Sequence, residues 1–115
     1  MSVVIYHNPK CTKSRQTLAL LEARGVKPKV VEYLKTPPSK TEIEHILKLL
    51  KLDPRVLMRR KEPIYKQARL DNPKLTRAQL VEAMTEHPIL LERPIVLANG
   101  KAAIGRPPEN VLDIL

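Results

Sequence analysis

One cysteine stands among positively charged residues early in the chain. Cys11 is the only cysteine of the 115 residues, and the stretch around it, YHNPKCTKSRQTL, also holds His7, Lys10, Lys13 and Arg15. A free thiol has a pKa of about 8.5, and nearby cations or a helix N-terminus lower that pKa because they stabilise the thiolate. A buried, inert cysteine seldom follows a proline turn among lysines and arginines. We therefore predict that Cys11 is a reactive nucleophile.

The spacing around Cys11 excludes three familiar kinds of cysteine chemistry. The motif CTKS has Ser14 where a dithiol oxidoreductase has its second cysteine, so thiol–disulfide exchange between two cysteines of this chain is excluded. A phosphatase-type loop would need an arginine at position 17, where Thr17 stands. The three histidines are far apart in sequence, and a lone cysteine supplies no paired motif, so we expect no metal site.

The composition narrows the class of protein further. With 43% apolar and 29% charged residues, the chain is ordinary for one globular domain, and its formal charge of +9 favours anionic partners. Tryptophan and phenylalanine are absent and no block of five or more like charges occurs, so nucleic acid is not an expected partner. No apolar run approaches the roughly 20 residues of a membrane span, and the first residues, MSVVIYHN, do not resemble a signal peptide. We expect a cytoplasmic protein without membrane association, and one unpaired cysteine agrees with a reducing compartment.

The first third of the sequence predicts a strand, a helix and a second strand. SVVIY is a short β-branched run followed by the turn signal Asn8-Pro9. From Thr12 onward apolar residues recur at helical spacing, and Gly25 stands where a left-handed helix cap belongs. KVVEYL reads as the second strand, and this order and length are typical of a βαβ unit with parallel strands. Cys11 is thereby placed at the N-terminus of a helix.

The middle of the sequence, at about 39–92, is predicted to be helical. Ser39 with Glu42 and Thr76 with Gln79 match the capping-box pattern at two helix starts. Asp53 and the proline after it predict a third helix over PRVLMRRK.

The end of the sequence returns to β structure. PIVLANGKAAIG predicts a hairpin that turns at Asn99-Gly100, and Pro107-Pro108 introduces a last helix. The complete order predicts an α/β protein, a single domain over 1–115 with a thioredoxin-like core, a mixed sheet and an inserted helical subdomain.

Five blocks of the sequence, taken in order, resemble one family over essentially the whole chain. They are YHNPKCTKSR, YLKTPPS, LMRRKEPIY, HPILLERPIV and IGRPPENVLDIL. The chain is similar to the glutaredoxin-coupled arsenate reductases, the ArsC family, and most of all to the short ArsC-like branch of the ArsC/Spx superfamily. The resemblance itself implies a thioredoxin-like fold with an inserted helical region.

The resemblance also implies an activity and a set of site residues. Cys11 would attack arsenate while Arg59, Arg93 and Arg106 hold the oxyanion, since guanidinium groups offer bidentate contacts that lysine cannot match. His7 and the helix N-terminus would keep the thiolate ionised. No cofactor would be bound, because glutathione would supply electrons from outside and a glutaredoxin would resolve the mixed disulfide. In thioredoxin-like folds the bond before the proline of Arg93-Pro94 is commonly cis.

Two other functions remain open from the sequence. Spx proteins share the fold and bind RNA polymerase as transcriptional regulators, but members typified by that role carry CxxC, where this chain has Ser14. A general glutathione-dependent thiol reductase would act on protein mixed disulfides. The three arginines favour an oxyanion, although they do not identify which oxyanion is the physiological substrate.

Overall fold

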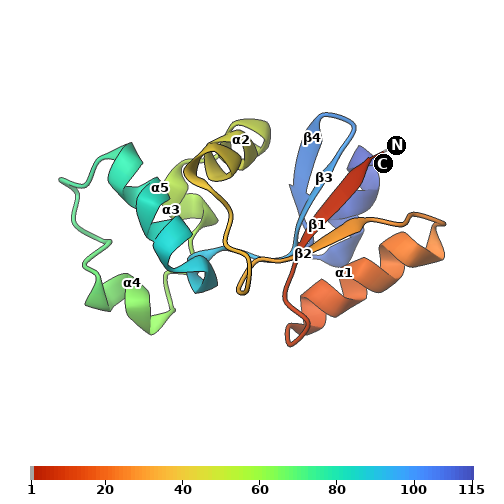
Figure 1. Ribbon diagram of the computed structural model, residues 1–115, viewed down its shortest axis with the longest axis horizontal. Helices are drawn as coiled ribbons and strands as arrows, with labels where there is room; N and C mark the ends of the chain where they lie inside the picture. The colour runs from red at the N-terminus through yellow and green to blue at the C-terminus, as the bar shows by residue number, and fades with distance from the viewer. Residues whose placement is uncertain (1) are drawn as a thin grey trace. The chain divides into compact units, whose positions relative to one another are not determined.

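The chain folds into two compact units. The computed structural model describes residues 2–115, and the first unit takes in the chain up to Thr36 together with Arg93–Leu115. The second unit is Pro37–Glu92, so it begins slightly before the helical insertion predicted at about 39–92. Figure 1 labels the elements of both units. Among the described residues, no helix is long and apolar enough to cross a membrane.

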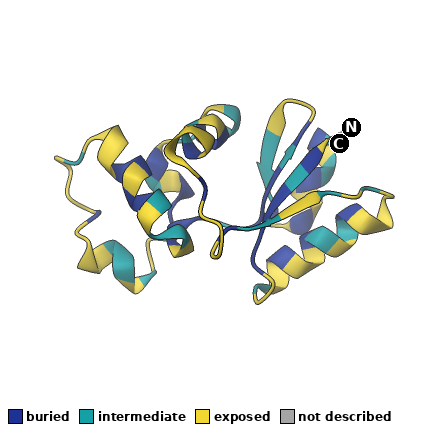
Figure 2. Ribbon diagram, viewed as in Figure 1, coloured by how far each residue is buried: buried dark blue, intermediate teal, exposed yellow. Residues whose placement is uncertain are grey.

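The first unit is built on a four-stranded mixed sheet. The strands are β1 (Val3–His7), β2 (Lys29–Glu32), β3 (Ile95–Ala98) and β4 (Lys101–Ile104), in the order β2-β1-β3-β4. β1 and β2 are parallel, as the βαβ pattern predicted, and β3 is antiparallel to both of its neighbours. The inner strands β1 and β3 are mostly buried, whereas the edge strands β2 and β4 are more exposed (Figure 2).

Helix α1 (Thr12–Ala23) connects the two parallel strands, and its ends follow the predicted signals. Cys11 is the N-cap residue, with extended backbone angles. At the other end Gly25 has φ +76°, and the amides of Gly25 and Val26 donate to the carbonyls of Glu22 and Leu21. These two hydrogen bonds form a Schellman motif, which explains why the helix stops where it does.

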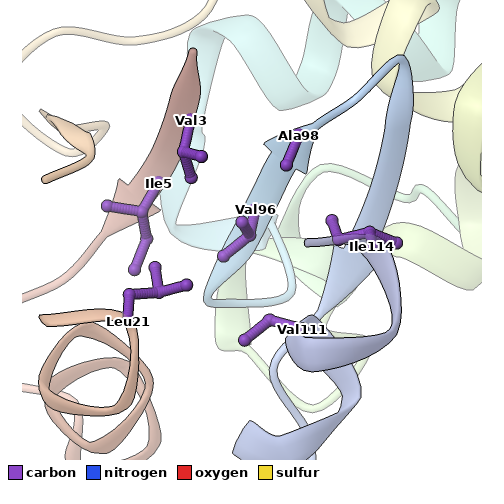
Figure 3. Packing of buried hydrophobic residues seen from close by; sticks show 7 residues of the cluster. All are labelled: Val3, Ile5, Leu21, Val96, Ala98, Val111 and Ile114. Carbon is purple, nitrogen blue, oxygen red and sulfur yellow. The ribbon is translucent and has the colours of Figure 1, made fainter. Parts of the chain in front are cut away.

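The core of this unit lies between one face of the sheet and two helices. Figure 3 shows side chains of β1 and β3 directed toward Leu21 of α1 and toward Val111 and Ile114 of the 3₁₀ helix η2 (Pro108–Ile114). The last helix is thus present as predicted, in 3₁₀ form. The sheet residues of the cluster are Val3, Ile5, Val96 and Ala98.

The β3–β4 hairpin turns at the residues predicted for it. Asn99 and Gly100 both have positive φ, +54° and +70°, which is the requirement of a two-residue type I′ turn. The turn sets the register in which Ile95 lies opposite Ile104.

The second unit consists of short helices. They are α2 (Lys40–Leu50), α3 (Pro54–Leu57), α4 (Pro63–Gln67), α5 (Arg77–Glu86) and the 3₁₀ turn η1 (Pro88–Leu90). Both predicted capping boxes are confirmed: the side chains of Ser39 and Thr76 each accept a hydrogen bond from the backbone three residues later.

The helix predicted over PRVLMRRK is wrong in its second half. α3 ends at Leu57, and Met58 is extended and forms an isolated β-bridge with Leu91. The amide of Arg59 donates to the carbonyl of Leu90 at 2.6 Å, and the amide of Glu92 donates to the carbonyl of Leu57 at 2.9 Å. Pairing with a distant segment replaces the helical hydrogen bonds here, so Arg59 lies on an extended segment.

Candidate active site

Cys11 occupies the junction between the loop after β1 and helix α1. Its amide donates to the carbonyl of Asn8 at 3.0 Å, and its own carbonyl accepts from the amide of Arg15 at 3.0 Å. The Asn8 side chain closes the loop further, because its Oδ1 accepts from the amide of Lys10 at 3.0 Å. The half-buried thiol is therefore held on a tight turn at a helix N-terminus.

The hairpin brings Arg93 and Arg106 together at this junction. Beyond the pair Ile95 and Ile104, the two chains stay side by side: the amide of Gly105 donates to the carbonyl of Pro94 at 2.9 Å. One residue further, Arg106 Nε donates to the carbonyl of Arg93 at 2.7 Å. Arg106 Nη2 then lies 3.6 Å from Cys11 Sγ. The structure thus joins Cys11 to residues from the far end of the chain.

Gly105 allows this approach because it has no side chain. A Cβ at this position would collide with Thr17 Oγ1 of α1 and would lie 2.7 Å from Pro94 Cγ. The Arg93-Pro94 bond is cis, as predicted, and the Arg106-Pro107 bond is also cis, which sequence reasoning did not foresee.

The surroundings of Cys11 lower the pKa of its thiol. Burial is the largest single influence and acts in the opposite direction, raising the pKa by disfavouring the charged form. The amide of Ser14, a hydrogen bond from Arg93, and the positive charges of Arg93 and Arg106 together outweigh it. The site therefore favours the thiolate, the form of cysteine that acts as a nucleophile.

Arg15, a cation close to Cys11 in sequence, contacts the loop and the start of α1. Arg15 Nη1 donates to the carbonyl of Pro9 at 2.9 Å, and its Nη2 donates to Thr12 Oγ1 at 3.3 Å. Arg15 therefore braces the loop and the first turn of α1.

His7 is held against the first turn of helix α1. The residue is buried, with 6% of its surface exposed, and its Nδ1 lies 2.6 Å from Ser14 Oγ. Burial is the main cause that lowers its pKa, the charge of Arg15 lowers it further, and Glu32 opposes both. A lowered pKa disfavours the positively charged form of His7, so burial weakens the stabilisation of the thiolate that we expected from this residue.

Ser14 is the residue that sequence reasoning missed. The sequence pattern marks it only as the position that lacks a second cysteine, yet it is fully buried and its Oγ accepts from the amide of Asn8 at 3.0 Å. Its backbone amide contacts the Cys11 thiol. The same residue thus binds His7, the loop and the thiol, and the burial that would have revealed it cannot be read from the sequence.

Arg59 lies in the second unit, among acidic partners. Its Nε lies 3.3 Å from Glu62 Oε1 and its Nη1 lies 3.7 Å from Glu92 Oε2. It lines a cavity of about 440 Å³ together with Arg60 and Lys61. Within the first unit, the structure brings together the predicted site residues Cys11, Arg93 and Arg106. Over residues 2–115, no group of three or more histidine, cysteine, aspartate or glutamate side chains is arranged to hold a metal ion.

Comparison with known proteins gives consistent matches along the whole chain. A family model described as the ArsC family matches residues 6–114. The arsenate reductase of Haemophilus influenzae is 53% identical over 116 residues, covering 100% of both chains. A protein of Escherichia coli K12 named "Uncharacterized protein YfgD" is also 53% identical, over 98% of this chain and 96% of its own.

A solved structure supports the same conclusion about the fold. The structure titled arsenate reductase from Vibrio cholerae has a TM-score of 0.97 and 55% identity, and the match covers 100% of this chain and 98% of that one. Together with the sheet order, this confirms the predicted thioredoxin-like α/β fold. The match of the family model and the full-length relatives show that the chain belongs to the ArsC family.

Proposed function

We propose that this protein reduces arsenate to arsenite through an adduct between arsenic and the Cys11 sulfur, with electrons from glutathione and a glutaredoxin. The observation that carries the proposal is the guanidinium of Arg106, which lies 3.6 Å from Cys11 Sγ and is linked to Arg93 through the carbonyl of that residue. A thiolate beside two guanidinium groups suits attack on an oxyanion. Relatives that are 53% and 55% identical carry the name arsenate reductase, which supports arsenate as the substrate.

The arginines would bind the substrate and stabilise the charge that develops on its oxygens. A tetrahedral dianion needs several donors, and the planar guanidinium provides paired N–H groups aimed at two oxygens. Arg93 and Arg106 provide such donors beside the thiol. Arg59 is assigned to the same task through its match to the family motif, and its ion pairs with Glu62 and Glu92 would orient its guanidinium.

The first chemical step would be attack of the Cys11 thiolate on As(V). A sulfur–arsenic bond forms, and one arsenate oxygen leaves as water after taking up protons. The Ser14 amide holds the thiolate before attack, and the arginines stabilise the oxygens during it. His7 would act as a positioning residue, since its contact with Ser14 Oγ fixes the first turn of α1.

The second step would transfer two electrons to arsenic. The thiolate of glutathione attacks the Cys11 sulfur, a mixed disulfide forms, and the electron pair of the sulfur–arsenic bond remains on arsenic, which leaves as arsenite. A glutaredoxin thiolate then attacks the glutathione sulfur of the mixed disulfide and releases the Cys11 thiolate. An external thiol is required because Cys11 is the only cysteine in the chain. Chemistry of this kind needs a reducing compartment, so we assign the protein to the cytoplasm.

A reconstituted assay tests the proposal. Purified protein, arsenate, glutathione and a glutaredoxin are combined, and arsenite is measured over time. We expect turnover that disappears in Cys11→Ser and disappears when glutathione and glutaredoxin are both omitted. Sustained turnover with thioredoxin alone would contradict the coupling. Absence of arsenate reduction together with retention of RNA polymerase in a pull-down would replace the enzyme with an Spx-like regulator, and cleavage of protein–glutathione disulfides alone would indicate a general thiol reductase.

A further inference from the structure

A cavity of about 230 Å³ opens where β1 and β2 end, beside the loop that carries Cys11. His7 and Glu32 form the last pair of the two parallel strands, so the cavity lies at the carboxyl edge of the sheet. This edge is where ligands of α/β proteins commonly bind. The residues that line the cavity are His7, Asn8, Pro9, Lys10, Glu32, Leu34 and Lys35.

The walls of the cavity combine an apolar surface with a pair of opposite charges. Pro9 and Leu34 supply the apolar part, and Leu34 is a large side chain with 42% of its surface exposed. Lys35 Nζ lies 3.6 Å from Glu32 Oε1. The turn after β2 sets this arrangement, since the amide of Lys35 donates to the carbonyl of Glu32 at 2.9 Å. An exposed pair of this kind contributes little stability and is available to exchange partners.

The charges are complementary to a small zwitterion with an additional negative charge. Glu32 can receive an ammonium group, while Lys35 and Lys10 can each receive a carboxylate. Glutathione carries one ammonium and two carboxylates, and the ammonium and one carboxylate share the α-carbon of its γ-glutamyl group. That end of the molecule matches Glu32 and Lys35, with its methylene groups against the apolar wall.

The cavity borders the residue that precedes Cys11. Lys10 lines it and is the neighbour of Cys11, and consecutive Cα atoms are about 3.8 Å apart. An extended tripeptide spans about 10 Å. Because the sulfur of glutathione is on its middle residue, the γ-glutamyl arm of a molecule joined to Cys11 can extend past Lys10.

We propose that this cavity is the subsite for the γ-glutamyl group of glutathione when its sulfur reacts at Cys11, with Glu32 and Lys35 as the specificity-determining residues. The proposal deepens the proposed function, on which it rests for the identity of the reductant. It is testable without arsenate, through exchange with glutathione disulfide: the Cys11 thiolate attacks one sulfur, a Cys11–glutathione disulfide forms, the original disulfide bond breaks, and one glutathione thiolate leaves.

The experiment measures the second-order rate of this exchange by intact-protein mass spectrometry at low salt. Lys35→Glu is compared with Lys27→Glu, which makes the same change of net charge at an exposed lysine outside the cavity. We expect Lys35→Glu to slow the reaction with glutathione disulfide about fivefold to tenfold and Lys27→Glu to change it by less than about twofold. The uncharged reagent 2-hydroxyethyl disulfide should react with both variants at the wild-type rate.

Two results would overturn the subsite. If Lys35→Glu and Lys27→Glu slow the reaction of Cys11 with glutathione disulfide equally, only the net charge of the protein matters. If Lys35→Glu slows the reactions with glutathione disulfide and with 2-hydroxyethyl disulfide equally, the substitution has disturbed the Cys11 thiol itself. If the protein does not reduce arsenate but Lys35→Glu still slows only the reaction with glutathione disulfide, the proposed function is wrong and the glutathione subsite remains supported.

Discussion

Replacing Arg106 with lysine keeps one positive charge and removes the guanidinium fork. In the structure, Arg106 Nε donates to the carbonyl of Arg93 at 2.7 Å while Nη2 lies 3.6 Å from Cys11 Sγ. A lysine has a single ammonium on a flexible stem and cannot make the anchoring hydrogen bond and face the sulfur with separate nitrogens. Arg106→Lys should therefore lose the preorganised donor that the proposed mechanism uses.

The size of the loss follows from the position of the side chain. Removing one donor to a developing oxyanion costs about 3 to 4 kcal/mol in a water-excluded site. Arg106 is exposed, and lysine retains the charge, so the loss should lie below that range. We expect about 2 kcal/mol, which corresponds to roughly a 30-fold decrease in kcat/KM for arsenate.

The assay is the reconstituted arsenate reduction, with Arg60→Lys as the matched control. Arg60 is an exposed arginine of the second unit, next in sequence to Arg59. Its replacement should change kcat/KM by less than about twofold, because a surface charge is conserved. An Arg106→Lys enzyme as active as wild type, or no less active than Arg60→Lys, would refute the reasoning. If the titration midpoint of Cys11 is unchanged in Arg106→Lys, stabilisation of the oxyanion is the main role of the guanidinium.

The close packing beside the site and one helix end allow further predictions. Gly105→Ala should lower the free energy of unfolding in urea by about 1 to 3 kcal/mol through overpacking against Thr17 and Pro94, and adding Thr17→Ala should recover part of the loss; purely additive effects would contradict this. The pKa of His7 is lower in the folded chain than in the unfolded one, so the unfolded chain binds more protons and stability should fall as pH drops below about 6.5. His7→Gln should flatten that pH dependence, and a slope equal to that of the wild type would show that other groups cause it. Thr76→Ala removes a capping box and should cost about 1 kcal/mol by the same urea measurement; an unchanged midpoint would show that the cap adds no stability.

Local signals were enough to predict most elements of the fold. The capping boxes of α2 and α5 and the Asn99-Gly100 turn each depend on residues within a few positions, so their hydrogen bonds could be expected from the sequence. The segment after α3 could not be predicted in this way. Met58 and Arg59 pair with Leu91 and Leu90, and a segment distant in sequence replaces the local helical hydrogen bonds there.

The candidate site shows the same division between local and distant causes. The position of Cys11 at a helix N-terminus follows from the residues around it, whereas the charges that lower its pKa come from Arg93 and Arg106. A signal for their proximity did exist. Arg93 precedes Asn99 by as many residues as Arg106 follows Gly100, so a two-residue turn places the two arginines opposite each other. Burial of His7, which lowers its pKa, depends on packing that no local pattern contains.

The pH dependence of Cys11 alkylation tests the central claim most directly, because the proposed mechanism requires a thiolate. The rate of reaction with iodoacetamide is measured against pH for the wild type, Arg93→Ala and Arg106→Ala. Since the Ser14 amide and the two arginines outweigh the opposing effect of burial, the wild-type midpoint should lie below about 8.5, and each substitution should raise it. A wild-type midpoint at or above that value, or midpoints that neither substitution moves, would contradict the account.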